Sequence, residues 1–356
     1  NLAKDETVVL TVTGAQINVG SSDNTYTLEW KGTAKESNYK HGKDSIGKLT
    51  VTAKPIDPSD TNGITVRNPL NSIYDGKEHR NAPFVEDKKT HATLIEDTDY
   101  TLTYTGDLVN VGTVKVTVKG IGNYQGSFEL SYHITKRKVS LTSANAEKVY
   151  DGKPLTNDTV TVGELGFAEN EGATYNVTGT ITNVGSTKNS FTYTLNEGTL
   201  ASNYDIETHE GTLEVTPVTD KVTVKISGKK DTVTYDGKPH VVEGYDVKEI
   251  SNPLYNASNI EFTGAAKAEG TEVNTYQMHL TSDQFSNTSA NFTNVKFMVT
   301  DGSLTIAPKS INPEDEKTGI KVTNPADSKY DGNEHRNKPT VTDTKTGVTL
   351  VENKDY

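Results

Sequence analysis

The chain has 356 residues, a formal net charge of -12 at pH 7 and no cysteine. The missing thiols exclude a disulfide framework, a thiol nucleophile and a thiolate metal site, and the acidity disfavours binding to nucleic acid or to an anionic membrane surface. No apolar run reaches the roughly 18 residues that a membrane span needs, and the length predicts two or more domains.

Four short sequence marks recur along the chain in a fixed order, which indicates internal repeats. The first mark is Y-D-G, which begins at Tyr74, Tyr150, Tyr235 and Tyr330. The second is T-G-x-x-x-N-V-G, found at residues 13–20, 105–112 and 178–185, with an altered copy, T-G-A-A-K-A-E-G, at 263–270. The third is Asn followed by an aromatic residue, at 38–39, 123–124, 203–204 and 291–292, and the fourth is a closing strand that begins at Gly47, Gly126, Gly211 and Gly302.

In chain order, these marks divide the sequence into five segments. Residues 1–55 carry the last three marks without Y-D-G and are predicted to be the C-terminal half of a repeat module. Residues 56–136, 137–217 and 218–309 carry all four marks and are predicted to be full modules. In residues 218–309 the second mark is altered. Residues 310–356 carry only Y-D-G and are predicted to be the N-terminal half of a module.

Alternation of apolar and polar residues predicts strands throughout the modules. Val114, Val116 and Val118 fall on one face of an extended segment, while Lys115 and Lys119 fall on the other. No stretch of about 11 residues shows a helical apolar period, so any helices should be short. The predicted fold is all-β: a tandem array of small Ig-like or β-sandwich-type modules that forms an elongated rod.

The Y-D-G mark is itself a turn signal. Glycine accepts the positive φ of a tight turn, and aspartate tolerates the position before it, so Asp-Gly after an aromatic strand residue favours a hairpin turn or a bulge. We predict a structural turn at each copy, made by Tyr74, Asp75, Gly76, Tyr150, Asp151, Gly152, Tyr235, Asp236, Gly237, Tyr330, Asp331 and Gly332.

A histidine follows three of the Y-D-G marks, which suggests a general-base, metal or ligand site there. In the near-identical segments S-I-Y-D-G-K-E-H-R-N and S-K-Y-D-G-N-E-H-R-N, an arginine follows the histidine. The second full module has Leu155 in its place, and a reacting group that is missing from one copy favours a structural turn. We expect no catalytic residues and keep as candidate ligand contacts His79, Arg80, His335 and Arg336.

Aromatic side chains at the surface could bind sugar. Most of the 17 tyrosines recur at matching positions of the modules, which favours a core or corner role. Trp30 does not recur and is the aromatic candidate for ligand contact, with a place at the edge of the core as the alternative.

Acidic linkers at two module junctions are candidates for calcium binding. The segments D-P-S-D-T-N-G and N-P-E-D-E-K-T-G are rich in oxygen ligands, but neither matches the roughly twelve-residue calcium loop. The alternative is a solvated linker in which proline limits bending. The candidate ligands are Asp57, Asp60, Glu314 and Asp315, and no other cofactor is expected.

A covalent cross-link is a further option for a thiol-free chain. A buried lysine beside an Asn or Asp side chain can condense with it to form an isopeptide bond, but linear sequence does not place the groups that this reaction needs.

Together, the Y-D-G corner, the T-G-x-x-x-N-V-G frame, the G-N-Y-Q-G loop and the closing G-x-L-x-V strand resemble the MBG and YDG-type repeats, Ig-like β modules of bacterial cell-surface proteins. The resemblance covers essentially the whole chain and departs from the pattern at residues 263–270. It implies an extracellular adhesin or fibre on the cell wall, in keeping with Gram-positive bacteria, whose repeats form a stalk. It carries over no catalytic residues.

We therefore expect a non-catalytic stalk or spacer that projects a binding tip from the cell, with neighbouring modules of the same chain as partners. Modules of roughly 30 to 40 Å would give four module equivalents a reach of roughly 120 to 160 Å. Two alternatives stay open: the repeats bind host glycan or protein multivalently, or the two half modules join head to tail between chains. Neither a nucleic acid partner nor membrane insertion is expected.

Overall fold

A computed structural model describes residues 1–40, 42–43, 45–314, 317 and 319–356. The protein is all-β, with 47% of residues in strands and 3% in helix, and the strands form many small sheets. This confirms the predicted all-β class. Among the described residues, no helix is both long and apolar enough to cross a membrane. The helical elements described are three-residue 3-10 turns: η1 (Glu36–Asn38), η2 (Ala201–Asn203), η3 (Ala257–Asn259) and η4 (Ser282–Gln284).

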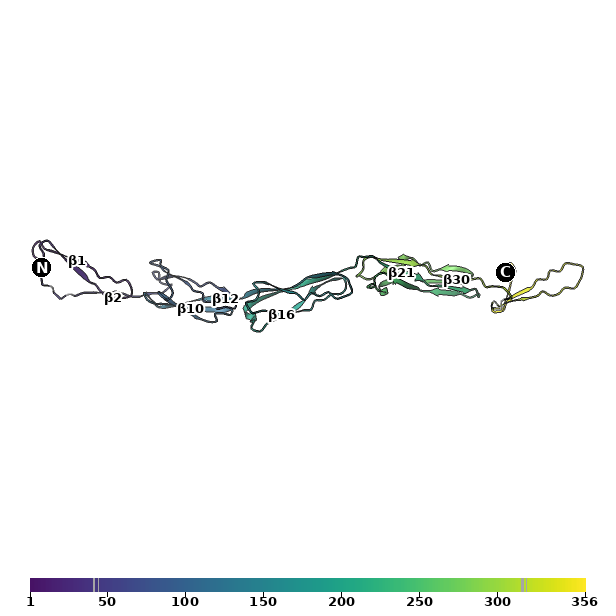
Figure 1. The fold of residues 1–356 in the computed structure, drawn as a ribbon, viewed down its shortest axis with the longest axis horizontal. Helices are drawn as coiled ribbons and strands as arrows, with labels where there is room; N and C mark the ends of the chain where they lie inside the picture. Colours follow the sequence, from purple (N-terminus) through teal and green to yellow (C-terminus); the bar gives the residue numbers. More distant parts are fainter. Residues whose placement is uncertain (41, 44, 315–316, 318) are drawn as a thin grey trace. The chain divides into compact units, whose positions relative to one another are not determined.

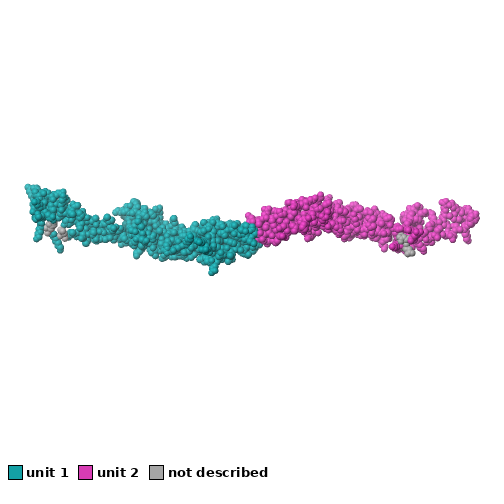
Figure 2. All heavy atoms as spheres, viewed as in Figure 1, with its two compact units in different colours: residues 1–144, 157–178, 189–211 teal, residues 145–156, 179–188, 212–356 magenta. Residues whose placement is uncertain are grey.

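The chain divides into two compact units, which Figure 2 shows in teal and magenta. Unit 1 contains residues 1–144, 157–178 and 189–211, and unit 2 contains residues 145–156, 179–188 and 212–356. The predicted module 137–217 therefore contributes residues to both units.

Unit 1 is made of antiparallel pairs, one parallel pair, one four-stranded sheet and one three-stranded sheet. The four-stranded sheet has the order β7-β12-β10-β9, and β10 and β12 lie side by side in it (Figure 1). The strands of unit 1 are β1 (Thr7–Val12), β2 (Gly20–Asp23), β3 (Tyr26–Lys31), β4 (Lys48–Val51), β5 (Lys54–Pro55), β6 (Ile64–Arg67), β7 (Ser72–Ile73), β8 (Phe84–Asp87), β9 (Tyr100–Thr105), β10 (Gly112–Gly120), β11 (Tyr124–Gln125), β12 (Ser127–Thr135), β13 (Arg137–Ser143), β15 (Val160–Glu164), β16 (Ala173–Val177), β18 (Phe191–Leu195) and β19 (Tyr204–His209).

Unit 2 contains four three-stranded sheets, of order β14-β20-β17, β24-β21-β29, β22-β30-β27 and β31-β32-β33. One residue each of β17 and β20 belongs to unit 1. The strands are β14 (Ala146–Val149), β17 (Gly185–Asn189), β20 (Gly211–Thr216), β21 (Val222–Gly228), β22 (Lys230–Thr234), β23 (His240–Glu243), β24 (Tyr245–Ile250), β25 (Ile260–Phe262), β26 (Lys267–Gly270), β27 (Asn274–Gln277), β28 (Phe285–Asn287), β29 (Val295–Thr300), β30 (Ser303–Ala307), β31 (Ile320–Thr323), β32 (Thr340–Asp343) and β33 (Val348–Leu350).

Strict alternation on β10 builds part of the core of unit 1. Val114, Val116 and Val118 are 0% exposed, whereas Lys115 and Lys119 are exposed. Successive side chains of a strand point to opposite faces of the sheet, so one face packs and the other meets water. The alternation predicted from the sequence is confirmed here.

Parallel pairing between strands far apart in sequence recurs in every predicted full module. The strand that leads into Y-D-G lies beside the closing strand: β7 beside β12, β14 beside β20, and β22 beside β30. The tyrosine N–H then donates to the end of the closing strand at 2.9 Å in each case, from Tyr74 to Thr135 O, from Tyr150 to Thr216 O and from Tyr235 to Ala307 O. In the two later modules, a second parallel pair lies earlier in the chain than the pair that leads into Y-D-G. These second pairs are β13 with β19 and β21 with β29.

Candidate functional site: the Y-D-G corners and the contacts between predicted modules

Each Y-D-G corner is held by its own aspartate. The φ angle is 79°, 75°, 74° and 81° at Gly76, Gly152, Gly237 and Gly332, a region that glycine adopts at no steric cost. In the first copy, the N–H of Lys77 donates to Asp75 Oδ1 at 2.9 Å, and the same bond recurs in the other three copies. The flanking strands do not pair with each other, since β7 pairs with β12 and β8 with β6. In the three full modules, Y-D-G therefore follows the end of a strand and redirects the chain, and it does not close the two-residue hairpin that its sequence favours.

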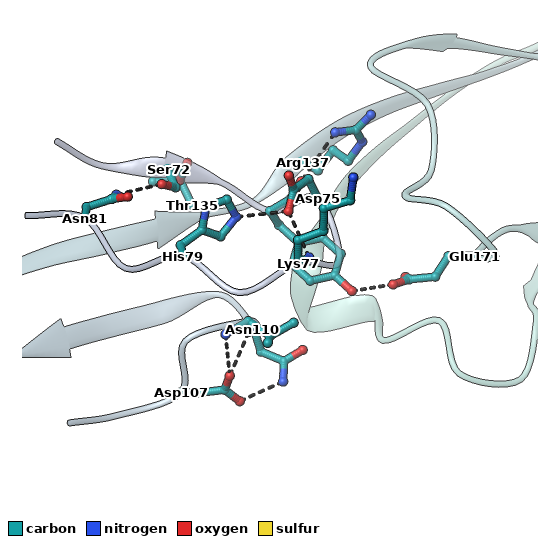
Figure 3. Close-up of polar contacts among 12 residues, drawn as sticks. Ser72, Asp75, Lys77, His79, Asn81, Asp107, Asn110, Thr135, Arg137 and Glu171 are labelled. Atoms are coloured by element: carbon teal, nitrogen blue, oxygen red, sulfur yellow. Dashed lines mark hydrogen bonds and ion pairs between the residues drawn. The ribbon is translucent and has the colours of Figure 1, made fainter. Parts of the chain in front are cut away.

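The histidine after Y-D-G completes this turn. His79 Nε2 lies 3.0 Å from Asp75 Oδ1 (Figure 3), and the matching distances in the third and fourth copies are 2.8 and 2.9 Å. The second copy has Leu155 instead of histidine, and there Lys148 Nζ lies 2.6 Å from Asp151 Oδ1. In each copy, a side-chain nitrogen therefore lies within hydrogen-bonding distance of the turn aspartate, although the residue that carries it differs.

The turn aspartate is kept in its ionised form. Burial raises the pKa of Asp75. The N–H of Lys77 and the His79 ring together lower this pKa by more than burial raises it, so it lies below its ordinary value. Across the part of the chain that the structure describes, no group of three or more His, Asp or Glu side chains lies together as metal ligands. The His–Asp pair supports the turn by hydrogen bonding.

The other candidate ligand contacts have partners within their own segments. Arg80 forms an ion pair with Glu78 at 2.6 Å, and its guanidinium carbon lies 5.5 Å from the centre of the Tyr104 ring. Arg336 forms the matching ion pair with Glu334. Trp30 is half-buried and stacks on Tyr39, with ring centres 5.2 Å apart.

The calcium candidates of the first linker cap turns. Asp57 Oδ1 accepts hydrogen bonds from the N–H and the hydroxyl of Ser59, at 2.8 and 2.7 Å, and these bonds lower the pKa of Asp57. Asp60 Oδ1 accepts from the N–H of Asn62 at 2.9 Å. In the second linker, the backbone N–H of Glu314 donates to an asparagine side chain, and Asp315 lies outside the described residues.

Asp87 of the first full module forms an ion pair with Lys54, which lies just before that module begins. Lys54 Nζ lies 2.8 Å from Asp87 Oδ2, and Asp87 is only 3% exposed. The same oxygen accepts from the Tyr124 hydroxyl at 3.1 Å, while Oδ1 accepts from the N–H groups of Lys89 and Thr90. A matching pair joins Lys309, the last residue of the third full module, to Asp343 of the segment 310–356.

This pair bears on the cross-link considered from the sequence. Burial raises the pKa of Asp87, but the hydrogen bonds, that of Lys54 foremost, keep the pKa well below its ordinary value. An ionised carboxylate is a poor electrophile for an amine. The geometry therefore supports a salt bridge at this place.

The second and third sequence marks meet in space at three places. In each, the Asn of the third mark accepts a hydrogen bond at Oδ1 from the Val N–H of a second mark, and its Nδ2 donates to the Asn Oδ1 of that mark. The Oδ1 distances are 2.8, 3.0 and 2.8 Å, and the Nδ2 distances are 3.0, 2.8 and 3.1 Å. The sets are Asn123 with Asn18 and Val19, Asn203 with Asn110 and Val111, and Asn291 with Asn183 and Val184.

Local structure prepares the accepting asparagine. Asp107 Oδ1 accepts from the N–H groups of Val109 and Asn110, at 2.8 and 2.9 Å, and its Oδ2 accepts from Nδ2 of Asn110 at 2.7 Å (Figure 3). Because the amide nitrogen of Asn110 is engaged by Asp107, its oxygen faces Asn203, which is 0% exposed. Asn110 is therefore oriented by a residue of its own mark.

An aromatic pair accompanies two of these contacts. The Y-D-G tyrosine of one predicted module meets the aromatic residue of the next edge to face: Tyr74 with Tyr204 at 5.5 Å, and Tyr150 with Phe292 at 5.7 Å. Rings at this separation and angle attract each other beyond the effect of burial alone.

Glu171 joins the first aromatic pair. Both the Tyr74 and the Tyr204 hydroxyls donate to its carboxylate, the second at 2.7 Å. Burial and then the Glu171 carboxylate raise the pKa of Tyr74 to about 12, and burial raises that of Tyr204 as well. The two rings are thus held in their neutral, donating form.

Sequence reasoning singled out both marks but did not pair them. The signal that could have found the contact is chemical: each mark keeps one asparagine, and an amide pairs well with another amide or with a backbone N–H.

A surface hollow of 420 Å³ lies beside the third Y-D-G corner, with Tyr235, Asp236 and Lys309 in its lining. Its ionisable groups are engaged, because Asp236 bonds to His240 and Lys309 to Asp343.

No protein-family model matches this chain, and a comparison with curated proteins finds no match.

Proposed function

We propose that the chain is a tandem array of non-catalytic structural modules, Ig-like β repeats of the MBG and YDG type that its sequence resembles. In this proposal the array forms a rod-like stalk or spacer of an extracellular bacterial adhesin or fibre, and it holds a binding tip away from the cell wall. The observation that carries the proposal is the recurrence of one bidentate asparagine contact at matching places of successive modules.

The strand pairing supports a load-bearing role. In residues 218–309, the early strand β21 pairs in parallel with β29, and β22 with the closing strand β30. In a parallel pair, the start of one strand and the end of the other lie at opposite ends of the ladder. Tension applied through the two ends of a module would load these hydrogen bonds in shear, so several must break together.

The contacts between modules support a restricted joint. Each asparagine contact supplies two hydrogen bonds, worth about 0.5 to 1.5 kcal/mol apiece, and the tyrosine pairs add aromatic packing. A linker held at several points bends less than a free peptide, which keeps an array extended.

Small-angle scattering of the chain tests this proposal. A rod of four module equivalents, roughly 120 to 160 Å long, would have a radius of gyration of roughly 35 to 45 Å. A compact globule of the same length would have about 20 Å. A value near the lower figure would contradict the stalk.

A second candidate function is weak multivalent binding of host glycan or protein. The exposed Arg80 and Arg336 of two near-identical segments favour it, because a repeated weak site gains avidity. Selective binding on a glycan or host-protein array that is lost when both arginines are replaced by alanine would support this candidate. An array without selective signal favours the pure spacer.

A further inference from the structure

We propose that the asparagine pair sets how firmly successive modules are held, and that residues 263–270 are a copy of the second mark in which this hold has been lost. The proposal rests on the stalk function above. It identifies the surface by which one module recognises the next.

The contact has a fixed polarity. The asparagine of the following module accepts from a backbone N–H, which no side-chain substitution can change, and it donates to the asparagine of the preceding module. Asn291 must therefore be both acceptor and donor, whereas Asn183 is needed there only as an acceptor. All three copies share this polarity.

The altered mark cannot offer the same surface. Ala268 and Glu269 stand where the other copies have Asn and Val, and alanine has no side-chain acceptor. Ala268 is 3% exposed and packs in a core cluster with Met278 and Leu304. It lies on β26, opposite Val242 of β23, whereas Asn183 is exposed.

In the altered mark, the residue at this position therefore packs in the core of its own module. A module that follows residues 218–309 finds no amide oxygen to bind, so we expect the joint after this module to bend more freely than the joints before it. Stiff and compliant joints along the array would then follow from one residue of the second mark.

Polarity provides a charge-matched test at the contact between Asn183 and Asn291. Asn183→Asp keeps an oxygen for Asn291 Nδ2, so the contact should survive. Asn291→Asp, made in the Asn183→Asp chain so that no Asn183 amide nitrogen can turn toward it, sets two side-chain oxygens against each other, so the contact should break. Each substitution is nearly isosteric and adds one negative charge.

The readout is the width of a distance distribution between two spin labels on either side of this contact. The chain has no cysteine, so Glu147→Cys and Lys296→Cys, at two exposed strand positions, provide unique attachment points. We expect Asn183→Asp alone to leave the distribution unchanged, and the added Asn291→Asp to broaden it at least about twofold. Equal broadening by both would overturn the proposal, because charge alone would then explain the effect, and so would no broadening by Asn291→Asp.

A second variant guards against misfolding of Asn291→Asp, which thermal unfolding would reveal. The exchange Asn183→Ala with Val184→Glu copies the altered mark into the second one, at the exposed Asn183 and the half-buried Val184. It should broaden the distribution as much as Asn291→Asp does, and an unchanged width would reject the proposal. An extended chain with unchanged widths would reject this inference and keep the stalk, whereas a compact chain in scattering would reject the stalk.

Discussion

The ion pair between Asp87 of the first full module and Lys54, just before that module, allows a quantitative test of what stabilises the module. Asp87→Asn preserves the shape of the side chain but removes its charge. In either orientation of the new amide, an NH₂ group replaces one of the two carboxylate oxygens. That NH₂ group cannot accept a hydrogen bond from the donors that now bind the carboxylate, which are Lys54 Nζ, the Tyr124 hydroxyl and the backbone N–H groups. The variant therefore leaves buried donors without an acceptor.

The expected cost follows from burial. Removing one partner of a buried ion pair costs about 3 to 5 kcal/mol. Asp87 is 3% exposed, but the Lys54 side chain is 28% exposed and can regain some water, so we expect about 3 kcal/mol, at the low end of that range. For a module of about 80 residues this lowers the melting temperature by roughly 12 to 24 °C.

Hydrogen exchange of β8 and β10, followed by mass spectrometry, measures this locally. Asp97→Asn is the matched control, because Asp97 is exposed and belongs to the same module. The native chain should also lose stability as the pH falls below about 4, because the pKa of Asp87 is lower in the folded than in the unfolded chain. Loss of protection no greater in Asp87→Asn than in Asp97→Asn would refute the reasoning.

Three further predictions concern the turns, the tyrosines and the linker. Gly237→Ala should destabilise the third module by about 1 to 2 kcal/mol in urea unfolding, because φ is +74° although a Cβ would meet no neighbour, and Gly47→Ala, which lacks a positive φ, should cost less. The contact around Tyr74 should weaken as the pH rises from about 10 to 12, because its raised pKa favours the neutral hydroxyl in the folded state, and ultraviolet absorption should show this titration beside that of ordinary tyrosines. Removal of calcium with a chelator should leave the melting temperature unchanged, because backbone donors already occupy Oδ1 of Asp57 and of Asp60, and a clear fall would assign a metal to this linker.

Local patterns predicted the local part of this fold. The alternation around Val116 fixes which residues are buried, because strand geometry alone sends neighbours to opposite faces. The glycine of Y-D-G likewise predicts a corner, since positive φ is a property of one residue.

Long-range structure was not accessible in the same way. Asn203 and Asn110 are 93 positions apart, and no local propensity couples them. The same holds for the parallel pairing of β22 with β30, which decides that Y-D-G ends a strand where a hairpin was favoured. The donors and acceptors of an asparagine predict that it needs hydrogen-bond partners, but they do not predict which residue is the partner.

Stretching the single chain between its termini tests the central claim most directly. Three full modules that unfold independently should give three events, each lengthening the chain by roughly 250 to 300 Å, because about 80 to 90 residues extend at about 3.6 Å each from a folded length of about 35 Å. A single event, or two events that match the two compact units in length, would contradict a tandem array of separate structural modules.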